Sequence, residues 1–400
     1  MRWRIQIIAS LITILLSCII EKTASLRPAS LRRALRLRAA FSESDEAEVD
    51  YVVIGSGIGG LSCAALLGYY GYSVEVLESH YLPGGCAHSF SLNGFKFDAG
   101  PSLWNGMDTK PYNPLRQILE IVGEGNSVQY AHYDGWVMHI PEGTFKFTVG
   151  ENEFEKVLSR FGGPTALNEW EQLNKAIEPV IDLSNAVPPL ALRSDAFAIL
   201  TLFPYLPKLI RGLPVVNKVE GSFKAISQEI VKDKFLENWF EFLSFALSGL
   251  PADGTIAAAV AYTMRDLHQR RASLDYPIGG SAAIVEALVR AIEKKSGRVS
   301  LSTHVKSINI ENGRASGVTI KTGKRIRAKR AVISNDSVWN TMQLLPKDLI
   351  ASIVSPGYIE NKMNTPMTGS FVHLHLGINA SGLPVIHPFH FLKSLIVCSR

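Results

Sequence analysis

The sequence predicts an α/β protein in which a Rossmann-type dinucleotide-binding domain is interrupted by an inserted, largely helical domain. Three observations support this prediction. A glycine cluster stands between two short apolar runs at residues 51–77, helical spacing dominates residues 163–250, and strand and turn patterns return at residues 276–335. This order predicts one sheet that is built from two separated pieces of chain.

Residues 1–41 read as a leader and are set aside from the fold prediction. They hold eight basic residues and one acid, a net charge of +7, and since the whole chain has +5 the remainder carries −2. The excess of positive charge therefore lies in the leader. The rest of the chain has no net positive charge that would favour binding to nucleic acid. An apolar run at residues 5–20 is typical of a signal peptide, and the arginine-rich residues 26–41 resemble a transit peptide. The two together are similar to the bipartite presequence of algae with secondary plastids. The alternative is an uncleaved anchor.

The first element after the leader is a strand followed by a glycine loop. Tyr51–Ile54 is a β-branched apolar run bounded by glycine, which suits a buried parallel strand. Gly55 allows a tight turn, Gly57 lets a pyrophosphate approach the backbone, and Gly60 lets the next helix pack closely against the sheet. That helix, predicted at residues 58–70, would present its free N–H groups to the pyrophosphate.

An acidic residue ends the second strand of this unit. The strand is predicted at residues 73–77, and Glu78 follows it, 23 residues after Gly55. A carboxylate at this place accepts hydrogen bonds from ribose hydroxyls and repels a 2′-phosphate, so NADP is disfavoured. Because strand, glycines, helix, strand and acid occur in the expected order, a ligand-free strand–turn–helix is the weaker interpretation.

Cysteine and histidine spacing gives no metal site. The four cysteines, Cys18, Cys63, Cys86 and Cys398, form no C-x-x-C pair, so neither a disulfide framework nor zinc is predicted. His304 has no partner cluster and is interpreted as an ordinary histidine at the solvent edge. We therefore predict no metal-binding site.

The middle of the chain combines a hairpin with helices. Residues 134–150 alternate around Glu142-Gly143 and predict the hairpin, and residues 163–250 are mainly helical. Residues 195–216 are apolar with prolines. They fit either a buried, proline-kinked helix, which we weigh slightly higher, or a surface segment that enters a membrane or opens a channel for a lipid-like substrate.

Residues 276–335 return to the α/β pattern. Gly279-Gly280 precede a predicted helix with Ser281 near its cap. The strand Val299–Leu301 is expected to extend the nucleotide sheet. The strands around the Asn312-Gly313 turn and beyond are expected to form a meander that caps that sheet.

Several of these stretches resemble one family of flavoproteins. An acid followed by paired glycines in "LESHYLPGGCAHSF", then "GFKFDAGPSLWNG" and a "YPIGG" segment leading through an N-G meander to "VISN", resemble the carotenoid isomerase-like branch of the FAD-dependent phytoene desaturase and amine oxidase superfamily. The glycine pair with His88 and Phe90 is also similar to retinol saturases. The resemblance covers about residues 50–380 and implies a Rossmann-type FAD-binding domain with an inserted substrate domain.

The resemblance also implies cofactor-binding residues, while catalytic side chains stay unknown. The resemblance implies FAD as the cofactor, and because G-x-G-x-x-G occurs only once in the sequence, a second, pyridine-nucleotide site is unsupported. The residues implied to line its pyrophosphate are Gly55, Ser56, Gly57 and Gly60. Glu78 would hold the adenosine ribose, Gly84 and Gly85 would let the chain pass close to the cofactor, and the backbone of Val305 would meet the adenine. The loop at residues 100–106 would approach the isoalloxazine.

Two departures from the family pattern affect the prediction. Amine oxidases commonly have arginine directly after the glycine pair, where this sequence has Cys86, so the amine-oxidase interpretation is weakened. The family also continues with a glycine-bearing segment that closes over the flavin, and the sequence ends at Arg400 without it, which predicts a truncated product or an incomplete gene model.

The predicted domain organisation follows from these assignments. The segments are 1–41 as presequence, 42–110 as the first part of the FAD-binding domain, 111–275 as the substrate domain, 276–340 as the second part of the FAD-binding domain, and 341–400 as the start of a returning substrate segment.

Three functions stay open at this point. The first is a redox-neutral cis–trans isomerase of carotenoids. The second is a net redox flavoenzyme, either a saturase or desaturase of carotenoids or retinoids or an amine oxidase. The third is a non-catalytic carotenoid-binding remnant. The expected partners are a long apolar polyene and a plastid membrane surface, with no nucleic acid and no metal, and the expected location is the plastid.

Overall fold

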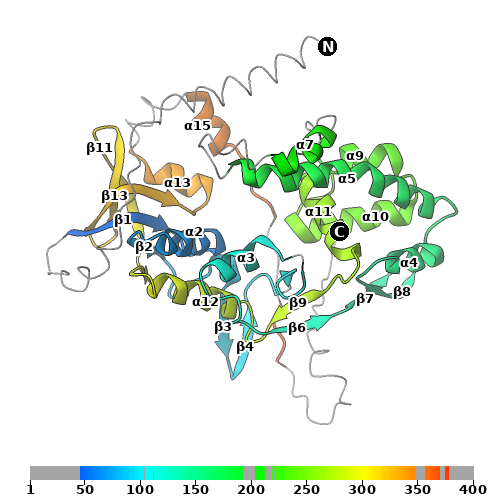
Figure 1. Cartoon of the computed structure of the whole chain (residues 1–400), viewed down its shortest axis with the longest axis horizontal. Helices are drawn as coiled ribbons and strands as arrows, with labels where there is room; N and C mark the ends of the chain where they lie inside the picture. Colours follow the sequence, from blue (N-terminus) through cyan, green and yellow to red (C-terminus); the bar gives the residue numbers. More distant parts are fainter. Residues whose placement is uncertain are drawn as a thin grey trace. The chain divides into compact units, whose positions relative to one another are not determined.

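A six-stranded β-sheet forms the centre of the larger of two compact units (Figure 1). The structure is a computed structural model that describes residues 46–102, 104–110, 112–191, 203–212, 219, 221–346, 356–369 and 374–377. We call the first unit the sheet unit; its described residues come from 46–154, 266–367 and 374–377. The second, the helical unit, holds those from 155–265 and 368–369. The predicted presequence lies outside the described residues.

The sheet combines strands from both ends of the described chain. In order across the sheet, the strands are β10 (Arg298–Ser300), β2 (Val74–Leu77), β1 (Glu46–Ile54), β13 (Arg325–Ser334), β12 (Arg314–Ile320) and β11 (Val305–Glu311). The first four run parallel to one another, and β11, β12 and β13 form an antiparallel meander. The prediction that the strand around Val299 extends the nucleotide sheet is therefore confirmed.

The prediction that the meander caps the sheet is wrong. β13 pairs with β1 in parallel from Arg325 to Ser334, whereas only residues 325–327 pair with β12. The last strand of the meander therefore lies inside the sheet, and the other two strands extend it. Burial accounts for the difference, because Val49 of β1 faces Ala328 of β13 and both side chains are buried.

Two helices cover one face of the sheet. α2 (Ile58–Tyr69) and α12 (Ala282–Glu293) contribute to one hydrophobic cluster with Val53, while the neighbouring Val52 belongs to a second cluster with β11, β12 and β13. Both valines are fully buried. Because successive strand residues point to opposite faces, the sheet is buried on both sides, which explains the continuous apolar run in β1.

A small hairpin and a three-stranded sheet follow the nucleotide-binding strands. A 3₁₀ turn, η1 (Gly85–Ala87), leads into β3 (Ser89–Leu92) and β4 (Phe95–Asp98), which are joined by Asn93-Gly94 with φ values of 51° and 81°. The second sheet has the order β5 (Trp104–Asn105), β9 (Leu274–Pro277) and β6 (Tyr130–Tyr133), and α3 (Pro114–Ile121) lies between β5 and β6 in sequence. β9 is thus the point at which the chain, after the helical region, pairs again with residues near 104 and 130.

The predicted hairpin is present at β7 (Gly135–Ile140) and β8 (Gly143–Thr148). Its turn is Pro141-Glu142, one residue earlier than expected, because Ile140 pairs with Gly143. Two further helices, α13 (Val338–Leu344) and α15 (Pro356–Met363), follow the six-stranded sheet in sequence.

The helical unit confirms the helical reading of residues 163–250. Its helices are α4 (Glu153–Phe161), which begins in the sheet unit, α5 (Ala166–Ala191), α7 (Leu206–Gly212), α9 (Lys224–Ile230), α10 (Lys234–Ser248) and α11 (Ala257–His268), which ends in the sheet unit. Trp170 and Phe240 stack with ring centroids 6.2 Å apart at its centre, and both are buried. Their burial stabilises the unit by several kcal/mol, at about 1.5–3 kcal/mol for each large side chain.

Only part of the apolar segment at 195–216 lies in the described chain. It forms η2 (Phe203–Tyr205) and α7, where Leu206 and Ile210 are 45% and 59% exposed. The buried-helix interpretation is therefore wrong for these residues. No helix in the described residues has the length and apolar character to cross a membrane.

Candidate functional site

The glycine loop forms a turn that opens the N-terminus of α2. Gly55 has φ 91°, a left-handed conformation that glycine adopts without strain, and a Cβ on Gly60 would lie 2.2 Å from the Gly55 carbonyl oxygen. Gly57 is the N-cap of α2, no side chain caps the helix, and its first turn has no acidic residue. The first N–H groups of a helix lack intrahelical acceptors, so this end of α2 is suited to bind an anion.

The glycine pair after the second strand crosses this loop directly. Gly84 forms a parallel bridge with Gly57, and its N–H donates to the backbone oxygen of Ser56 at 3.0 Å. Gly85 has φ 56°, and a Cβ on it would lie 3.0 Å from the Cα of Gly57. The two glycine motifs are therefore in contact, and a side chain at Gly85 would push against Gly57.

Glu78 lies behind the loop and is bonded to it. Its Oε2 accepts hydrogen bonds from the backbone N–H of Ser56 at 2.8 Å and from the Ser56 hydroxyl at 2.6 Å. Its Oε1 accepts from the N–H of His80 at 2.8 Å and from the Ser79 hydroxyl at 3.3 Å. The Ser56 oxygen in turn accepts from the N–H of Gly84 at 3.1 Å. Ser56 thus connects Glu78 to the glycine pair.

This bonding keeps the Glu78 carboxylate ionised. Burial alone raises its pKa, but the hydrogen bonds from Ser56, His80 and Ser79 outweigh burial, and the pKa lies below the ordinary value. The side chain is 8% exposed. A carboxylate has about four acceptor positions, and these four bonds use them, so a ribose hydroxyl would take the place of the longest one, the 3.3 Å bond from Ser79.

The backbone next to Glu78 continues toward Val305. The N–H of Glu78 donates to Ser300, and the N–H of Thr303 donates to the Glu78 carbonyl at 2.7 Å. Val305 begins β11, is 6% exposed and shares a hydrophobic cluster with Leu77. The structure therefore places the chain just before Val305 next to the backbone of Glu78, while the role of Val305 at an adenine stays a prediction.

Asn335 is a residue of this site that the sequence prediction missed. It follows β13, and its N–H donates to the Ile54 carbonyl at 2.8 Å, which places it beside the end of β1. A Cβ on Gly57 would lie 2.8 Å from Asn335 Nδ2, and one on Gly59 would lie 2.8 Å from Asn335 Oδ1. The signal that could have located it is the "VISN" strand end, because ligands of α/β sheets bind at the carboxyl ends of parallel strands.

A second network fixes the loop at residues 100–106, which was expected to approach the flavin. Asp98 Oδ1 accepts from the Ser89 hydroxyl at 2.5 Å and from the N–H of Ser281 at 2.9 Å. A Cβ on Gly100 would lie 2.3 Å from the carbonyl oxygen of Cys86, so the loop touches the turn that follows the glycine pair. Sequence reasoning assigned no role to Asp98 or Ser89.

These features fit the two phosphates and the ribose of a dinucleotide. The uncapped N-terminus of α2 suits the pyrophosphate, the crossing glycines leave space for it, and ionised Glu78 suits ribose hydroxyls. Both donors of Ser56 are used within the protein, so its predicted contact with the pyrophosphate stays a prediction. Within the described ranges no three His, Cys, Asp or Glu side chains gather to hold a metal. Fold and loop together define a dinucleotide-binding protein of the Rossmann class.

Comparisons with known proteins agree with this class. Residues 53–121 match the family model of an NAD(P)-binding Rossmann-like domain. The crystal structure of an oxidoreductase from Methanosarcina mazei has a TM-score of 0.51 and 23% identity, covering 76% of this chain and 63% of that chain, and so shares the fold.

Two curated relatives identify the family. The chain is 30% identical over 358 residues to the chloroplastic prolycopene isomerase of Daucus carota, covering 86% of this chain and 55% of the relative. It is 29% identical over 325 residues to the all-trans-retinol 13,14-reductase of Homo sapiens, covering 78% and 51%. The chain belongs to the family that contains the prolycopene isomerases and the all-trans-retinol 13,14-reductases, and the resemblance and fold class predicted from the sequence are confirmed. It spans about half the length of these relatives.

Proposed function

We propose that the chain binds FAD at the glycine loop and acts on a carbon–carbon double bond of a long apolar polyene, with cis–trans isomerisation as the reaction. The contact between the two glycine motifs at Gly57 and Gly84 is the observation that carries the cofactor proposal. The relatives carry the substrate proposal, since they are named for prolycopene and retinol.

Glu78 supports FAD over NADP. Its carboxylate is ionised and fixed at the end of β2, where it would repel a 2′-phosphate and accept ribose hydroxyls. The sequence has one G-x-G-x-x-G, so a separate pyridine-nucleotide site has no counterpart in it. A flavin without a dedicated electron supply suits a reaction that returns its electrons to the same substrate.

The chain's own residues would bind and orient the cofactor. The N–H groups at the start of α2 would bind the pyrophosphate, Glu78 the ribose, and the backbone of Val305 the adenine. Asn335 lies against the glycine loop and would keep its backbone in place. When bound, FAD supplies reversible electron transfer to and from a double bond, and the protein supplies orientation and exclusion of water.

Net reduction of a double bond is the second candidate. The similarity to all-trans-retinol 13,14-reductases favours it, because those relatives are named for reduction and match this chain almost as well. A non-catalytic polyene-binding protein is the third candidate.

We further propose a plastid location, since the first relatives are named chloroplastic. We also propose contact with a membrane through the exposed apolar residues of α7.

The test is turnover of a poly-cis carotenoid in liposomes without oxygen. The protein is supplied with FAD and a small amount of chemical reductant, and product mass and flavin absorbance are followed together. A more trans product of unchanged mass, formed in excess over the reductant, supports isomerisation. Products two hydrogens heavier, formed in step with reductant consumed, would replace it with reduction. A protein that binds stoichiometric flavin and carotenoid but forms no product would support the non-catalytic candidate.

A further inference from the structure

The glycine loop holds one glycine beyond those of the G-x-G-x-x-G motif. The glycines of the motif are Gly55, Gly57 and Gly60, and Gly59 is the additional one. A Cβ on Gly59 would lie 2.8 Å from Oδ1 of Asn335, and a Cβ on Gly57 would lie 2.8 Å from Nδ2 of the same side chain. Real Cβ atoms do not come this close to a neighbour, so both glycines leave space for the Asn335 amide.

The backbone of Asn335 is fixed, while its side-chain amide is available to a ligand. The backbone N–H donates to the carbonyl of Ile54 at 2.8 Å, directly after Ile54 pairs with Ser334 in the parallel sheet. Among the described residues the amide has no hydrogen-bond partner, and the residue is exposed. A side-chain amide has two N–H donors and an acceptor oxygen. Both ends of this amide can therefore bond to a ligand at the loop.

The amide nitrogen borders the side of Gly57 from which a pyrophosphate approaches. The second glycine of the motif lacks a side chain so that the pyrophosphate can come close to the backbone. At Gly57 the space that a side chain would take is bordered by Nδ2 of Asn335. Gly57 is also the N-cap of α2, and no side chain caps this helix. A pyrophosphate bound to the first N–H groups of α2 would therefore meet the Asn335 amide.

The carboxylates near this amide are bonded elsewhere. Asp336 follows directly in the chain, and its Oδ1 accepts from the N–H of Ser337 at 2.6 Å and from Nδ2 of Asn340 at 3.0 Å, at the start of α13. Glu78 accepts from the backbone N–H and the hydroxyl of Ser56. Neither carboxylate takes the hydrogen bonds of the amide, so its donors remain for a ligand.

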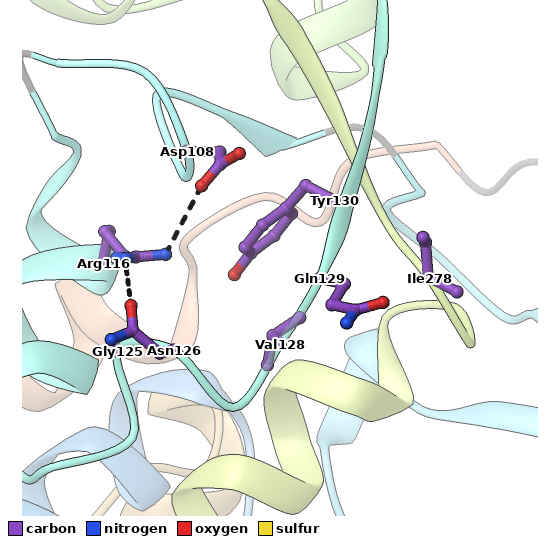
Figure 2. A pocket seen from close by; sticks show the side chains of 8 residues that line it. All are labelled: Asp108, Arg116, Gly125, Asn126, Val128, Gln129, Tyr130 and Ile278. Carbon is purple, nitrogen blue, oxygen red and sulfur yellow. Dashed lines mark hydrogen bonds and ion pairs between the residues drawn. The ribbon is translucent and has the colours of Figure 1, made fainter.

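The pocket beside α3, lined in part by the loop before β6, is a poorer place for a pyrophosphate. Arg116 is the cation in its lining, and it is already paired with Glu120 at 3.3 Å and lies 3.9 Å from Asp108. Figure 2 shows Arg116 between Asp108 and Asn126. A pyrophosphate in this pocket would meet existing negative charge. Asn126 is exposed like Asn335 and gives a matched control at this second place.

We infer that the side chain of Asn335 is part of the pyrophosphate site, where its Nδ2 donates a hydrogen bond to a phosphate oxygen of the bound dinucleotide. A hydrogen bond to an ionised phosphate is about twice as strong as one between neutral groups. This inference rests on the proposed function, because it requires a dinucleotide at the glycine loop. It adds a direct contact to the role of keeping the loop backbone in place, and it accounts for the glycine at position 59.

The probes are ADP, which has the pyrophosphate and the adenosine of FAD, and adenosine, which lacks the phosphates. Dissociation constants are measured by calorimetry on the purified chain at constant ionic strength. Asn335→Ala removes the amide without adding charge and should weaken ADP binding by about tenfold, the typical effect of losing a hydrogen bond to a charged group. Its affinity for adenosine should stay within about twofold of the wild type. Asn335→Asp replaces the donor with a carboxylate and should weaken ADP binding further.

Asn126→Ala makes the same deletion at the pocket beside α3 and should leave ADP binding unchanged. Circular dichroism checks that each variant is folded. ADP binding that neither Asn335 variant weakens would overturn the inference alone. An equal loss of ADP and adenosine affinity in Asn335→Ala would overturn the direct contact, because the residue would then act only by holding the loop. A wild-type chain that binds neither ADP nor FAD would overturn the proposed function together with this inference.

Discussion

The Ser56 hydroxyl donates a hydrogen bond of 2.6 Å to Oε2 of Glu78, 22 residues further along the chain. The same hydroxyl oxygen accepts from the N–H of Gly84, so one side chain joins the glycine loop, the end of β2 and the second glycine pair. Because Ser56 is fully buried, water cannot replace these bonds. The glycine loop is therefore positioned by the same acid that the sequence assigns to a ribose.

Ser56→Ala is expected to destabilise the protein by about 1–3 kcal/mol, the typical loss when a buried charged acceptor loses its donor. The measurement is the midpoint of urea unfolding without added cofactor. Ser62→Ala is the matched control, since Ser62 is buried in the neighbouring helix α2 and its hydroxyl has no hydrogen-bond partner among the described residues. Equal stability of the two variants would show that the Ser56–Glu78 bond contributes nothing.

Gly57→Val should abolish retention of FAD. A Cβ at this position would already lie 2.8 Å from Asn335 Nδ2, and two further methyl groups would fill the space through which a pyrophosphate approaches the helix. The flavin-to-protein ratio after purification is the measurement. Gly357→Val in α15 is the control, because no atom lies within 4 Å of the added Cβ there. A folded Gly57→Val protein with a full complement of yellow flavin would contradict the site.

His268 should make the protein less stable in mild acid. It lies against Phe147 and Phe154, with ring centroids 5.7 and 5.4 Å away, and burial lowers its pKa to about 4. His268 binds a proton near pH 6.5 in the unfolded chain but only near pH 4 in the folded protein. The free energy of unfolding is therefore highest above pH 6.5 and falls as the pH decreases toward 4. Between pH 7 and 4.5 the loss should be on the order of 2–3 kcal/mol.

The check is urea unfolding across this pH range in two variants. His268→Phe should remove most of the slope, because the buried group can no longer titrate. His304→Phe, at an exposed position, should keep it. If both variants retain the wild-type slope, another group is responsible for the acid sensitivity.

The sequence predicted local units more completely than the contacts between distant ones. The strand, glycine loop and helix at residues 51–70 follow from short-range patterns, and the Asn312-Gly313 turn has the expected positive φ values of 51° and 72°. The same N-G signal at Asn93-Gly94 is present in the sequence and indicates the β3–β4 hairpin. This hairpin could therefore have been predicted with the same Asn-Gly turn rule.

Long-range pairing could not be predicted in this way. β9 pairs with β5 and β6, which are more than 140 residues earlier in the chain, and no spacing rule connects them. Asp275 illustrates the result, because it is fully buried in β9 and accepts hydrogen bonds from the N–H groups of Met107 and Asp108. Asp98 was missed at the candidate site for the same reason, since its contact with Ser281 comes from tertiary structure, whereas Asn335 could have been located from its place at the end of a predicted strand.

The exposed apolar residues of α7 should contribute to membrane binding. Leu206 and Ile210 are four positions apart, on one face of the helix, and Arg211 is adjacent and half or more exposed, an arrangement suited to a lipid interface. Leu206→Glu with Ile210→Glu should lower co-sedimentation with phosphatidylcholine–phosphatidylglycerol vesicles by about tenfold or more, because burying each side chain in lipid contributes about 1–2 kcal/mol. The control pair is Leu167→Glu with Leu247→Glu, because Leu167 on α5 and Leu247 on α10 are 40% and 43% exposed. If vesicle binding falls equally in both pairs, the added negative charge alone explains the loss. If vesicle binding is unchanged in the α7 pair, α7 does not contact the membrane.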